Sequence, residues 1–443
     1  MKRLRIHTFG CQMNVYDSER MAELLAPLGY EPAARDEDAD LILVNTCSVR
    51  EKPEQKVLSL VGRLAPLKAI RPGLLIGITG CVGRQHGEDL IRQAPALDLV
   101  IGPDQVGRIA SLVRRLEEGL GPVVATGEEE DPGRMFQRGS VRGAPATTRF
   151  VSIMKGCDQY CSYCIVPYVR GREVSRPPEA VLQEAEALLA GGARDLILLG
   201  QNVNRYGIGH RDLPDFATLL RQVHDLPGLA RLSFVTSNPG DCPDELLRAF
   251  GELPRLAPYF HLPMQSGSDP ILKRMNRRYD RARYFALVDR LREVRPRIHL
   301  STDLIVGFPG ETEADFEATL DAARRVRWGS AYSFAYSSRP GTRAAGWPDD
   351  VPREEKMRRL AVLQDLLHAT MMEGLQGHIG ETMEVLVEGP SRRGAGQLTG
   401  RTETNYVINF TGAGEDRIGD LVRVQVLAAA QHSLLGVLEE ATE

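Results

Sequence analysis

The sequence predicts an α/β fold in three parts: a parallel-sheet α/β domain, a partial (β/α)6 barrel and a small antiparallel β-barrel. Strand-like and helix-like segments alternate over residues 1–120, which is typical of a parallel sheet covered by helices. The alternation resumes over residues 150–345 with six strand–helix units, which indicates an open version of the (β/α) barrel. From residue 376 onward, short apolar runs separated by glycines indicate a small barrel.

The first domain, residues 1–120, contains four strand–helix pairs. Its expected strands are Arg3–Phe9, Leu41–Asn45, Leu74–Thr79 and Leu97–Ile101. Its expected helices are Asp17–Pro27, Glu51–Leu64, Gln85–Gln93 and Val106–Glu117. Residues 121–149 interrupt this rhythm with the acidic run Glu128–Asp131 and with several glycines and prolines, so we expect a linker or a long crossing segment there.

The second domain, residues 150–375, contains six units and a trailing helix. Its expected strands are Phe150–Met154, Asp195–Leu199, Arg231–Val235, Tyr259–Leu262, His299–Ile305 and Ala331–Tyr336. Its expected helices are Pro178–Ala190, Phe216–Val223, Asp244–Phe250, Arg281–Val294, Glu313–Arg325 and the long Val351–Gly374. The third domain, residues 376–443, has expected strands at Met383–Val387, Asn405–Phe410, Leu421–Val426 and Leu434–Val437.

The composition is that of an ordinary globular chain of 443 residues, with 42% hydrophobic residues, 26% charged residues and a net charge of −4. Apolar runs such as Leu41–Val44 are far too short to cross a bilayer, and Met1–His7 lacks the apolar core of a secretion signal. We therefore expect a cytoplasmic location without membrane contact. Seven cysteines are too few for a disulfide scaffold, and their clustering favours metal binding or catalysis.

Three cysteines form a C-x-x-x-C-x-x-C motif after the first strand of the second domain: Cys157, Cys161 and Cys164. Three thiolates on one loop can bind three irons of a [4Fe–4S] cluster, and without a fourth cysteine one iron keeps an open site. The alternatives are buried thiols or a zinc site, which usually needs four ligands. Barrels carry their chemistry at the carboxyl ends of the strands, which favours the cluster.

This segment resembles the radical S-adenosylmethionine (SAM) superfamily. Polar residues and glycines follow three further strands, in the runs Gly200–Asn204, Val235–Pro239 and His261–Ser268, and the run Ser301–Glu311 covers the fifth strand and its turn. The candidates to bind SAM or the substrate are Gln201, Ser237, Gln265 and Asp303. Each of them could equally cap a helix or satisfy backbone groups. Tyr163, just before the third cysteine, is expected beside the bound nucleoside.

Three further cysteines each follow a predicted strand of the first domain: Cys11, Cys47 and Cys81. Because parallel strands end at the same edge of a sheet, these thiols should meet in space. Gly10 and Gly80 permit the backbone to turn closely around a bulky ligand. We predict a second [4Fe–4S] cluster with one open iron; the alternative is three unrelated buried cysteines. Cys242 has no cysteine near it in the sequence and is expected to be structural.

These pieces, in this order, resemble the methylthiotransferases over essentially the whole chain. The runs Cys11–Arg20, Asn45–Lys52 and Arg170–Arg176 resemble the tRNA branch that makes 2-methylthio-N6-isopentenyladenosine. The resemblance implies that all six cysteines are metal ligands holding two [4Fe–4S] clusters, and that residues from about 376 form a TRAM domain. The amino-terminal cluster would carry the sulfur, which one SAM methylates, and a second SAM would be cleaved to a radical at the other cluster.

The same resemblance implies a transferase acting in tRNA processing. Its target would be C2 of the N6-isopentenyladenosine at position 37, next to the anticodon. C2 carries an unactivated hydrogen, so cofactor chemistry is required. The base lies in the anticodon loop and can be splayed out without opening a duplex.

Contacts with tRNA are predicted from local charge. Residues 271–298 carry ten Lys or Arg against three Asp or Glu. Five arginines there could meet phosphates, unless they form a solvated helix face: Arg274, Arg277, Arg278, Arg281 and Arg283. The chain from Gln376 onward carries five Arg against ten Asp or Glu, which is unusual for an RNA-binding module. A local basic patch could still form there from Arg392, Arg393 and Arg401.

Further partners follow from the resemblance: an electron donor such as flavodoxin or ferredoxin, and a sulfur or cluster-repair donor. The chain is expected to be a monomer. One alternative is a methylthiotransferase acting on threonylcarbamoyladenosine in tRNA or on a ribosomal-protein aspartate. Others are a non-catalytic RNA-binding iron–sulfur sensor and a zinc-stabilised RNA-binding protein.

Overall fold

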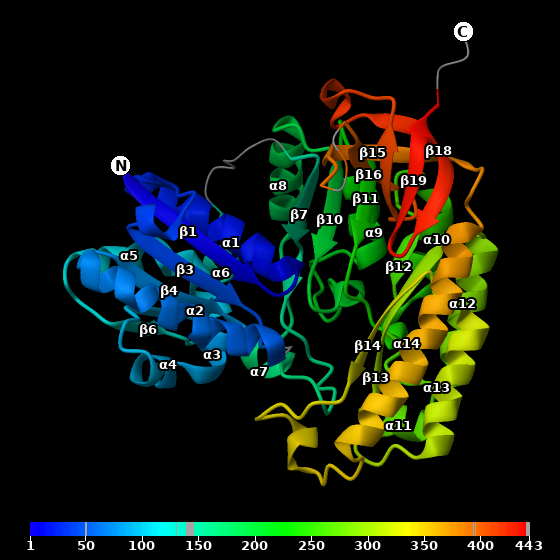
Figure 1. Cartoon of the computed structure of the whole chain (residues 1–443), viewed down its shortest axis with the longest axis horizontal. Helices are drawn as coiled ribbons and strands as arrows, with labels where there is room; N and C mark the ends of the chain where they lie inside the picture. Colours follow the sequence, from blue (N-terminus) through cyan, green and yellow to red (C-terminus); the bar gives the residue numbers. More distant parts are fainter. Residues whose placement is uncertain (49–50, 130, 139–145, 393, 395, 440–443) are drawn as a thin grey trace.

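The computed structural model describes residues 1–48, 51–129, 131–138, 146–392, 394 and 396–439, which fold into three units (Figure 1). An α/β unit at the amino terminus lies beside a partial barrel, and a small closed β-barrel lies at one end of the partial barrel. This arrangement confirms the predicted fold class. Within the described residues, no helix is both long enough and apolar enough to cross a membrane.

The amino-terminal unit contains a six-stranded sheet in the order β2-β1-β3-β4-β5-β6, in which every neighbouring pair is parallel. Its strands are β1 (Lys2–Phe9), β2 (Tyr30–Pro32), β3 (Leu41–Thr46), β4 (Leu75–Gly80), β5 (Leu99–Ile101) and β6 (Val123–Ala125). Its helices are α1 (Gln12–Leu25), α2 (Glu51–Ile70), α3 (Cys81–His86), α4 (Glu88–Gln93) and α5 (Ile109–Glu117).

Helices cover both faces of this sheet, and the central strand β3 has apolar side chains on both of its sides. Leu41 and Leu43 pack in the apolar cluster that contains α1 and α5, whereas Ile42 and Val44 pack with α2 and α4 on the other face. Every residue of β3 is buried. A strand that is apolar on both sides is stable only between two layers of helices. The sheet therefore gives a fixed base for the loops at its carboxyl edge.

Residues 121–149 differ from the predicted linker. Within them, β6 extends the sheet by pairing in parallel with β5, and the short helix α6 (Pro132–Met135) packs against the 3-10 helix Pro103–Arg108. A strand of three residues leaves too short an apolar run to be recognised in the sequence. Residues 139–145 lie outside the described residues.

The second unit contains six parallel strands in chain order. They are β7 (Thr148–Ser152), β10 (Asp195–Leu199), β11 (Arg231–Phe234), β12 (Tyr259–His261), β13 (His299–Val306) and β14 (Ser330–Ala335). They form two three-stranded sheets, which a parallel bridge between Leu232 and Leu256 connects. Among the described strands β7 and β14 do not pair, so the barrel is open.

Helices cover the outside of these strands (Figure 1). They are α8 (Pro178–Ala190), α9 (Phe216–His224), α10 (Asp244–Glu252), α12 (Arg281–Val294) and α13 (Glu313–Val326). Shorter elements lie in the loops: β8 (Met154–Lys155), α7 (Val166–Arg170), β9 (Val174–Ser175) and α11 (Asp269–Arg274). The core contains a cluster of aromatic rings from Phe234, Phe250 and Phe260, with centroids 5.3–5.8 Å apart.

The long helix α14 (Arg353–Gln376) leads into the closed barrel, whose strand order is β15-β16-β17-β19-β18. Its strands are β15 (Thr382–Pro390), β16 (Leu398–Thr402), β17 (Val407–Thr411), β18 (Leu421–Ala430) and β19 (Ser433–Leu438). All neighbouring pairs are antiparallel except β17 and β19. Strand β16 is not among the strands expected from the sequence, because only Leu398 in it is a large apolar residue.

This closed barrel lies at the amino ends of the partial-barrel strands. Arg231, at the start of β11, donates a 3.0 Å hydrogen bond to the Arg401 carbonyl, and the ring centroids of His299 and Tyr406 are 4.3 Å apart. The carboxyl ends of the same strands are at the opposite edge, where the cysteine loop follows β7 and β8.

Candidate active site

The three amino-terminal cysteines follow neighbouring strands of one sheet: Cys11 after β1, Cys47 after β3 and Cys81 after β4. In the register of this sheet Phe9 pairs with Thr46, which pairs with Gly80, so the three strands end at one level. The Cys47 thiol hydrogen-bonds both of the other thiols. The structure thus brings together three predicted ligands that are 36 and 34 positions apart in the sequence.

Two glycines and two asparagines shape the backbone around these thiols. A Cβ atom on Gly10 would lie 2.6 Å from the Cys47 Cβ, and one on Gly80 would lie 2.5 Å from the Asn45 Oδ1. Asn14 and Asn45 join the loops, because Asn14 Nδ2 donates to Asn45 Oδ1 at 3.0 Å and Asn45 Nδ2 donates to the Asn14 carbonyl at 2.8 Å. Both asparagines lie within the motifs Cys11–Arg20 and Asn45–Lys52, whose sequence alone does not predict this contact.

The chemistry of this donor set suits iron. Hydrogen bonding to Cys47 lowers the pKa of Cys11 to about 6 and that of Cys81 to about 7, and the positive charge of Arg170 acts in the same direction. The same hydrogen bonds raise the pKa of Cys47. A thiolate is the form that binds metal. Three buried hydroxyls at this edge find no hydrogen-bond partner among the described residues: those of Thr46, Ser48 and Thr79.

The second cysteine group lies on one loop between β8 and α7. Gly156 begins this loop with φ +74°, where a Cβ atom would lie 1.9 Å from the Arg172 carbonyl oxygen, so the backbone requires glycine. The backbone N–H of Gly156 donates to Gln201 Oε1. Burial, with the neighbouring thiols, raises the pKa of Cys164 to about 12 and also raises that of Cys157. Metal binding requires the thiolate form, so iron would have to displace protons from these two thiols.

Arg277 contacts this loop instead of the surface. Its Nη1 donates to Cys161 Sγ at 3.3 Å and its Nη2 to the Pro263 carbonyl at 3.3 Å. The expectation that Arg277 meets a phosphate is therefore wrong, because its guanidinium is used inside the site. The contact between Arg277 and Cys161 could not be predicted from the sequence, because 116 positions separate the two residues.

The two cysteine groups adjoin each other. Cys81 packs in one apolar cluster with Ile165 and Val169, which come one and five positions after Cys164. Arg170, at the end of α7, hydrogen-bonds the Cys81 thiol and donates to Asp17 Oδ2 of α1 at 3.0 Å. A residue of the second cysteine segment therefore contacts a predicted ligand of the first.

Three of the SAM candidates follow strands at the carboxyl edge of the partial barrel, namely Gln201, Ser237 and Gln265, whereas Asp303 lies within β13. Hydrogen bonds join only some of them. Gln265 has φ +70°, and its backbone N–H donates to the Asp303 backbone carbonyl at 2.8 Å. The Asp303 carboxylate lies 3.4 Å from His261 Nε2. Gln201 Nε2 and Ser237 Oγ are buried without a hydrogen-bond partner among the described residues. Buried polar atoms of this kind are usually satisfied, so both are suited to a bound ligand.

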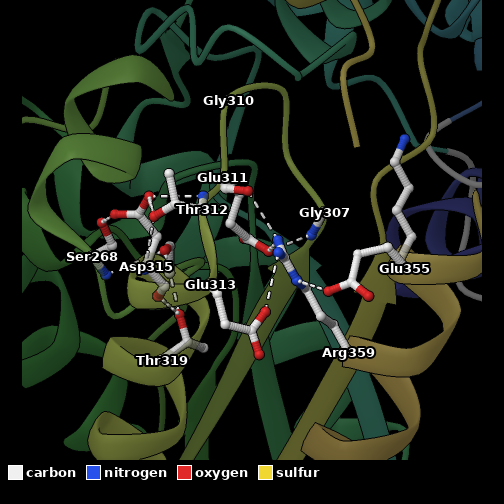
Figure 2. Close-up of polar contacts among 12 residues, drawn as sticks. Ser268, Gly307, Gly310, Glu311, Thr312, Glu313, Asp315, Thr319, Glu355 and Arg359 are labelled. Carbon is white, nitrogen blue, oxygen red and sulfur yellow. Dashed lines mark hydrogen bonds and ion pairs between the residues drawn. The ribbon is translucent and has the colours of Figure 1, made fainter. Parts of the chain in front are cut away.

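The loop after β13 is fixed by a buried ion pair (Figure 2). Arg359 of α14 donates to Glu311 Oε1 at 2.9 Å, and the Gly307 amide donates to the same oxygen at 2.7 Å. The side chains of Arg359 and Glu311 are only 6% and 1% exposed. Helix α14, which comes after the last barrel strand, therefore holds the glycine-rich turn of residues 307–311 in place.

Other predicted residues have mainly local contacts. Cys242 accepts from Asn204 Nδ2 at 3.3 Å, within the barrel. Tyr163 packs edge-on against Phe308, with ring centroids 6.3 Å apart. Arg401 pairs with Glu388 at 3.0 Å. Cation–π and backbone contacts hold two of the arginines expected at phosphates, Arg281 and Arg283. Arg392 is exposed, and Arg393 lies outside the described residues.

An open six-stranded barrel with a C-x-x-x-C-x-x-C loop at its carboxyl edge defines a radical SAM enzyme. The model of the radical SAM superfamily matches residues 151–323. Residues 3–102 match the uncharacterized protein family UPF0004, and residues 377–438 match the TRAM domain. Among solved structures, the radical SAM methyltransferase TsrM from Kitasatospora setae is similar in fold, with a TM-score of 0.60 and 17% identity over 78% of this chain and 77% of that one.

Full-length relatives define the family more closely. The tRNA-2-methylthio-N(6)-dimethylallyladenosine synthase of Syntrophobacter fumaroxidans is 47% identical over 98% of this chain and 95% of its own length. That of Neisseria gonorrhoeae strain NCCP11945 is 45% identical over the whole of both chains. The chain belongs to this family, the tRNA-2-methylthio-N(6)-dimethylallyladenosine synthases, which are radical SAM tRNA methylthiotransferases. The cofactors of the family are SAM and two [4Fe–4S] clusters.

Proposed function

We propose that this chain replaces the C2 hydrogen of N6-isopentenyladenosine at position 37 of tRNA with a methylthio group. The observation that carries the proposal is that the two cysteine segments lie side by side, since Arg170, six positions after Cys164, hydrogen-bonds Cys81. A single cluster would suffice for radical formation alone. A second group of thiols beside the first supports a reaction that also delivers sulfur.

In this proposal Cys11, Cys47 and Cys81 hold one cluster, and Cys157, Cys161 and Cys164 hold the other. When bound, these clusters and SAM supply the sulfur, the methyl group and the electron that breaks a carbon–sulfur bond to start radical chemistry. The protein's own residues position these parts. Arg277 orients the Cys161 sulfur, and Arg170 keeps Cys81 next to the second loop.

The unpaired atoms of Gln201 and Ser237 support a role in binding SAM, together with Gln265 and its neighbour Asp303. Closely placed reactants and exclusion of water are what a radical reaction requires of its protein. A low-potential electron donor such as flavodoxin or ferredoxin and a sulfur or cluster-repair donor complete the proposed set of partners.

The test is an anaerobic reaction of the reconstituted chain with SAM, a reductant and an anticodon stem-loop RNA that carries N6-isopentenyladenosine. We expect 2-methylthio-N6-isopentenyladenosine and 5′-deoxyadenosine as products. A matched RNA with threonylcarbamoyladenosine at the same position should stay unmodified. Formation of neither product by a chain that contains about eight irons would overturn the proposal and favour a non-catalytic sensor.

A further inference from the structure

An exposed pair of tyrosines stands on the rim of the second cysteine loop. Among the described residues, only three Tyr, Phe or Trp side chains are exposed: Tyr160, Tyr168 and Tyr332. Tyr160 and Tyr168 are 43% and 47% exposed, and their rings meet edge to face with centroids 6.2 Å apart. Tyr160 directly precedes Cys161 and Tyr168 lies in α7. Both therefore belong to the segment that carries the second cysteine group and contacts the first group through Arg170.

The backbone holds Tyr160 in this exposed position. Its φ of +47° lies in the left-handed region, which a bulky residue rarely adopts. Asn276 fixes the turn, because its Nδ2 donates to the carbonyls of Tyr160 at 2.9 Å and Gln159 at 3.1 Å. A strained and exposed aromatic residue at the edge of a reaction site is typical of a contact surface for a ligand.

The surroundings of the pair carry positive charge that carboxylates do not neutralise. Arg274 and Arg278 flank Asn276, and Arg343 precedes Ala344, whose amide donates to the Ser162 carbonyl of the cysteine loop at 2.7 Å. All three arginines are exposed, and none forms an ion pair with a described carboxylate. Exposed arginines of the helices on the outside of the barrel, such as Arg324 and Arg325, do have acidic partners.

We propose that Tyr160 and Tyr168 form a stacking platform for a base of single-stranded RNA, and that Arg274, Arg278 and Arg343 contact the flanking phosphates. Every base offers a flat π face. Arg274 and Arg343 lie over the Trp347 ring, 4.8 and 5.9 Å from its centroid, and this contact leaves their charge without a carboxylate, so that it can attract phosphate oxygens. A base that reaches the cysteine loops from an RNA loop must bring its neighbouring nucleotides to this rim. This inference rests on the proposed function and identifies where the flanking nucleotides bind.

The experiment measures the Kd of the anticodon stem-loop for the reconstituted full-length chain by fluorescence anisotropy at several salt concentrations. We expect Tyr160→Ala and Tyr168→Ala each to weaken binding about tenfold without changing the salt dependence. The conservative Tyr160→Phe and Tyr168→Phe variants keep the ring and should bind like the wild type. Arg274→Ala, Arg278→Ala and Arg343→Ala should each weaken binding and reduce the salt slope by about one.

Matched controls lie in the amino-terminal unit. Leu120→Ala removes an exposed apolar side chain and Arg115→Ala an exposed arginine without an acidic partner among the described residues, and both should leave the Kd unchanged. Iron content and circular dichroism establish that each variant is folded and loaded. Wild-type RNA affinity in both Tyr→Ala variants would overturn the platform while leaving the proposed function standing.

Two other results would contradict the proposed stacking platform, each in its own way. If the Tyr→Ala variants bind RNA normally but are reduced slowly by an acidic electron-transfer protein, the rim is a protein-docking surface instead. If the wild-type chain neither binds nor modifies the stem-loop, the proposed function itself fails.

Discussion

Arg170 donates a 3.0 Å hydrogen bond to Asp17, and both side chains are buried where the amino-terminal unit meets the partial barrel. A second ion pair of the same kind joins Lys155 to Asp104 at 2.7 Å. Lys155 comes two positions before Cys157, and Arg170 comes six positions after Cys164. Both ends of the second cysteine segment are therefore attached to carboxylates of the unit that carries the first cysteine group.

Loss of the Arg170 guanidinium should loosen this junction. Among the described residues, Arg170→Met leaves the buried Asp17 carboxylate with the more distant Arg20, at 3.7 Å, as its one cation, so we expect a loss of about 2–4 kcal/mol in the free energy of unfolding. Denaturant unfolding of the anaerobic apoprotein measures it. Arg172→Met is the control, because this arginine pairs with Asp158 on the surface, where solvent screens the pair, so its loss should change the free energy of unfolding much less. Equal losses in both variants would contradict the role of the buried pair.

Removal of the hydrogen bond from Arg277 should shift the reduction potential of the cluster at Cys161. A donor to a cysteine sulfur stabilises the reduced cluster, so Arg277→Met should lower the potential by about 60 mV, the equivalent of one charged hydrogen bond of about 1.4 kcal/mol. Titration followed by electron paramagnetic resonance measures the shift. Arg278→Met, on the exposed neighbour, should leave the potential unchanged, and a shift of similar size there would argue against the assignment.

The pair between Glu311 and Arg359 should behave as a coupled unit. Arg359→Met leaves Glu311, whose pKa burial already raises, without its cation, and we expect a loss of about 3–5 kcal/mol. Adding Glu311→Gln should restore much of this loss, because the buried charge is then gone. A double-mutant cycle from thermal or denaturant unfolding gives the coupling energy. Simple additivity of the two losses would show that the pair does not act together.

The junction with the closed barrel should weaken in mild acid. Burial, with the charge of His378, lowers the pKa of His299 to about 4, below its ordinary value of 6.5. Between these values the unfolded chain binds a proton that the folded chain does not, so stability falls as the pH falls from about 6.5 towards 4. The contribution is about 2 kcal/mol between pH 7 and pH 5. His299→Gln should lose this part of the pH dependence in unfolding curves at the two pH values, and an unchanged slope would refute the assignment.

The iron content of cysteine variants distinguishes the two predicted clusters from each other. Cys47→Ala and Cys161→Ala should each reduce the iron content from about eight to about four per chain, because each change removes a ligand of one cluster. Cys242→Ser should keep about eight, since its sulfur contacts Asn204 and belongs to neither group. Loss of iron in the Cys242 variant, or full iron content in both others, would contradict the assignment of ligands.

The fold and the cysteine groups were predictable because they depend on patterns that repeat along the chain. The alternation of strands and helices is enough to predict that Cys11, Cys47 and Cys81 lie at one edge of the sheet. The features that could not be predicted depend on contacts between residues that are far apart in the sequence. The charge of Arg277 is visible in the sequence and makes it a candidate for a phosphate contact or a solvated helix face, whereas the sulfur that it contacts is 116 positions away. The three-residue strand β6 leaves too short a pattern to recognise.

The most direct test of the central claim is nucleoside analysis of tRNA from a strain that lacks this protein. The account predicts that 2-methylthio-N6-isopentenyladenosine is absent, that N6-isopentenyladenosine accumulates, and that the wild-type chain restores the product while the Cys47→Ala variant does not. An unchanged level of 2-methylthio-N6-isopentenyladenosine in the deletion strain would contradict it.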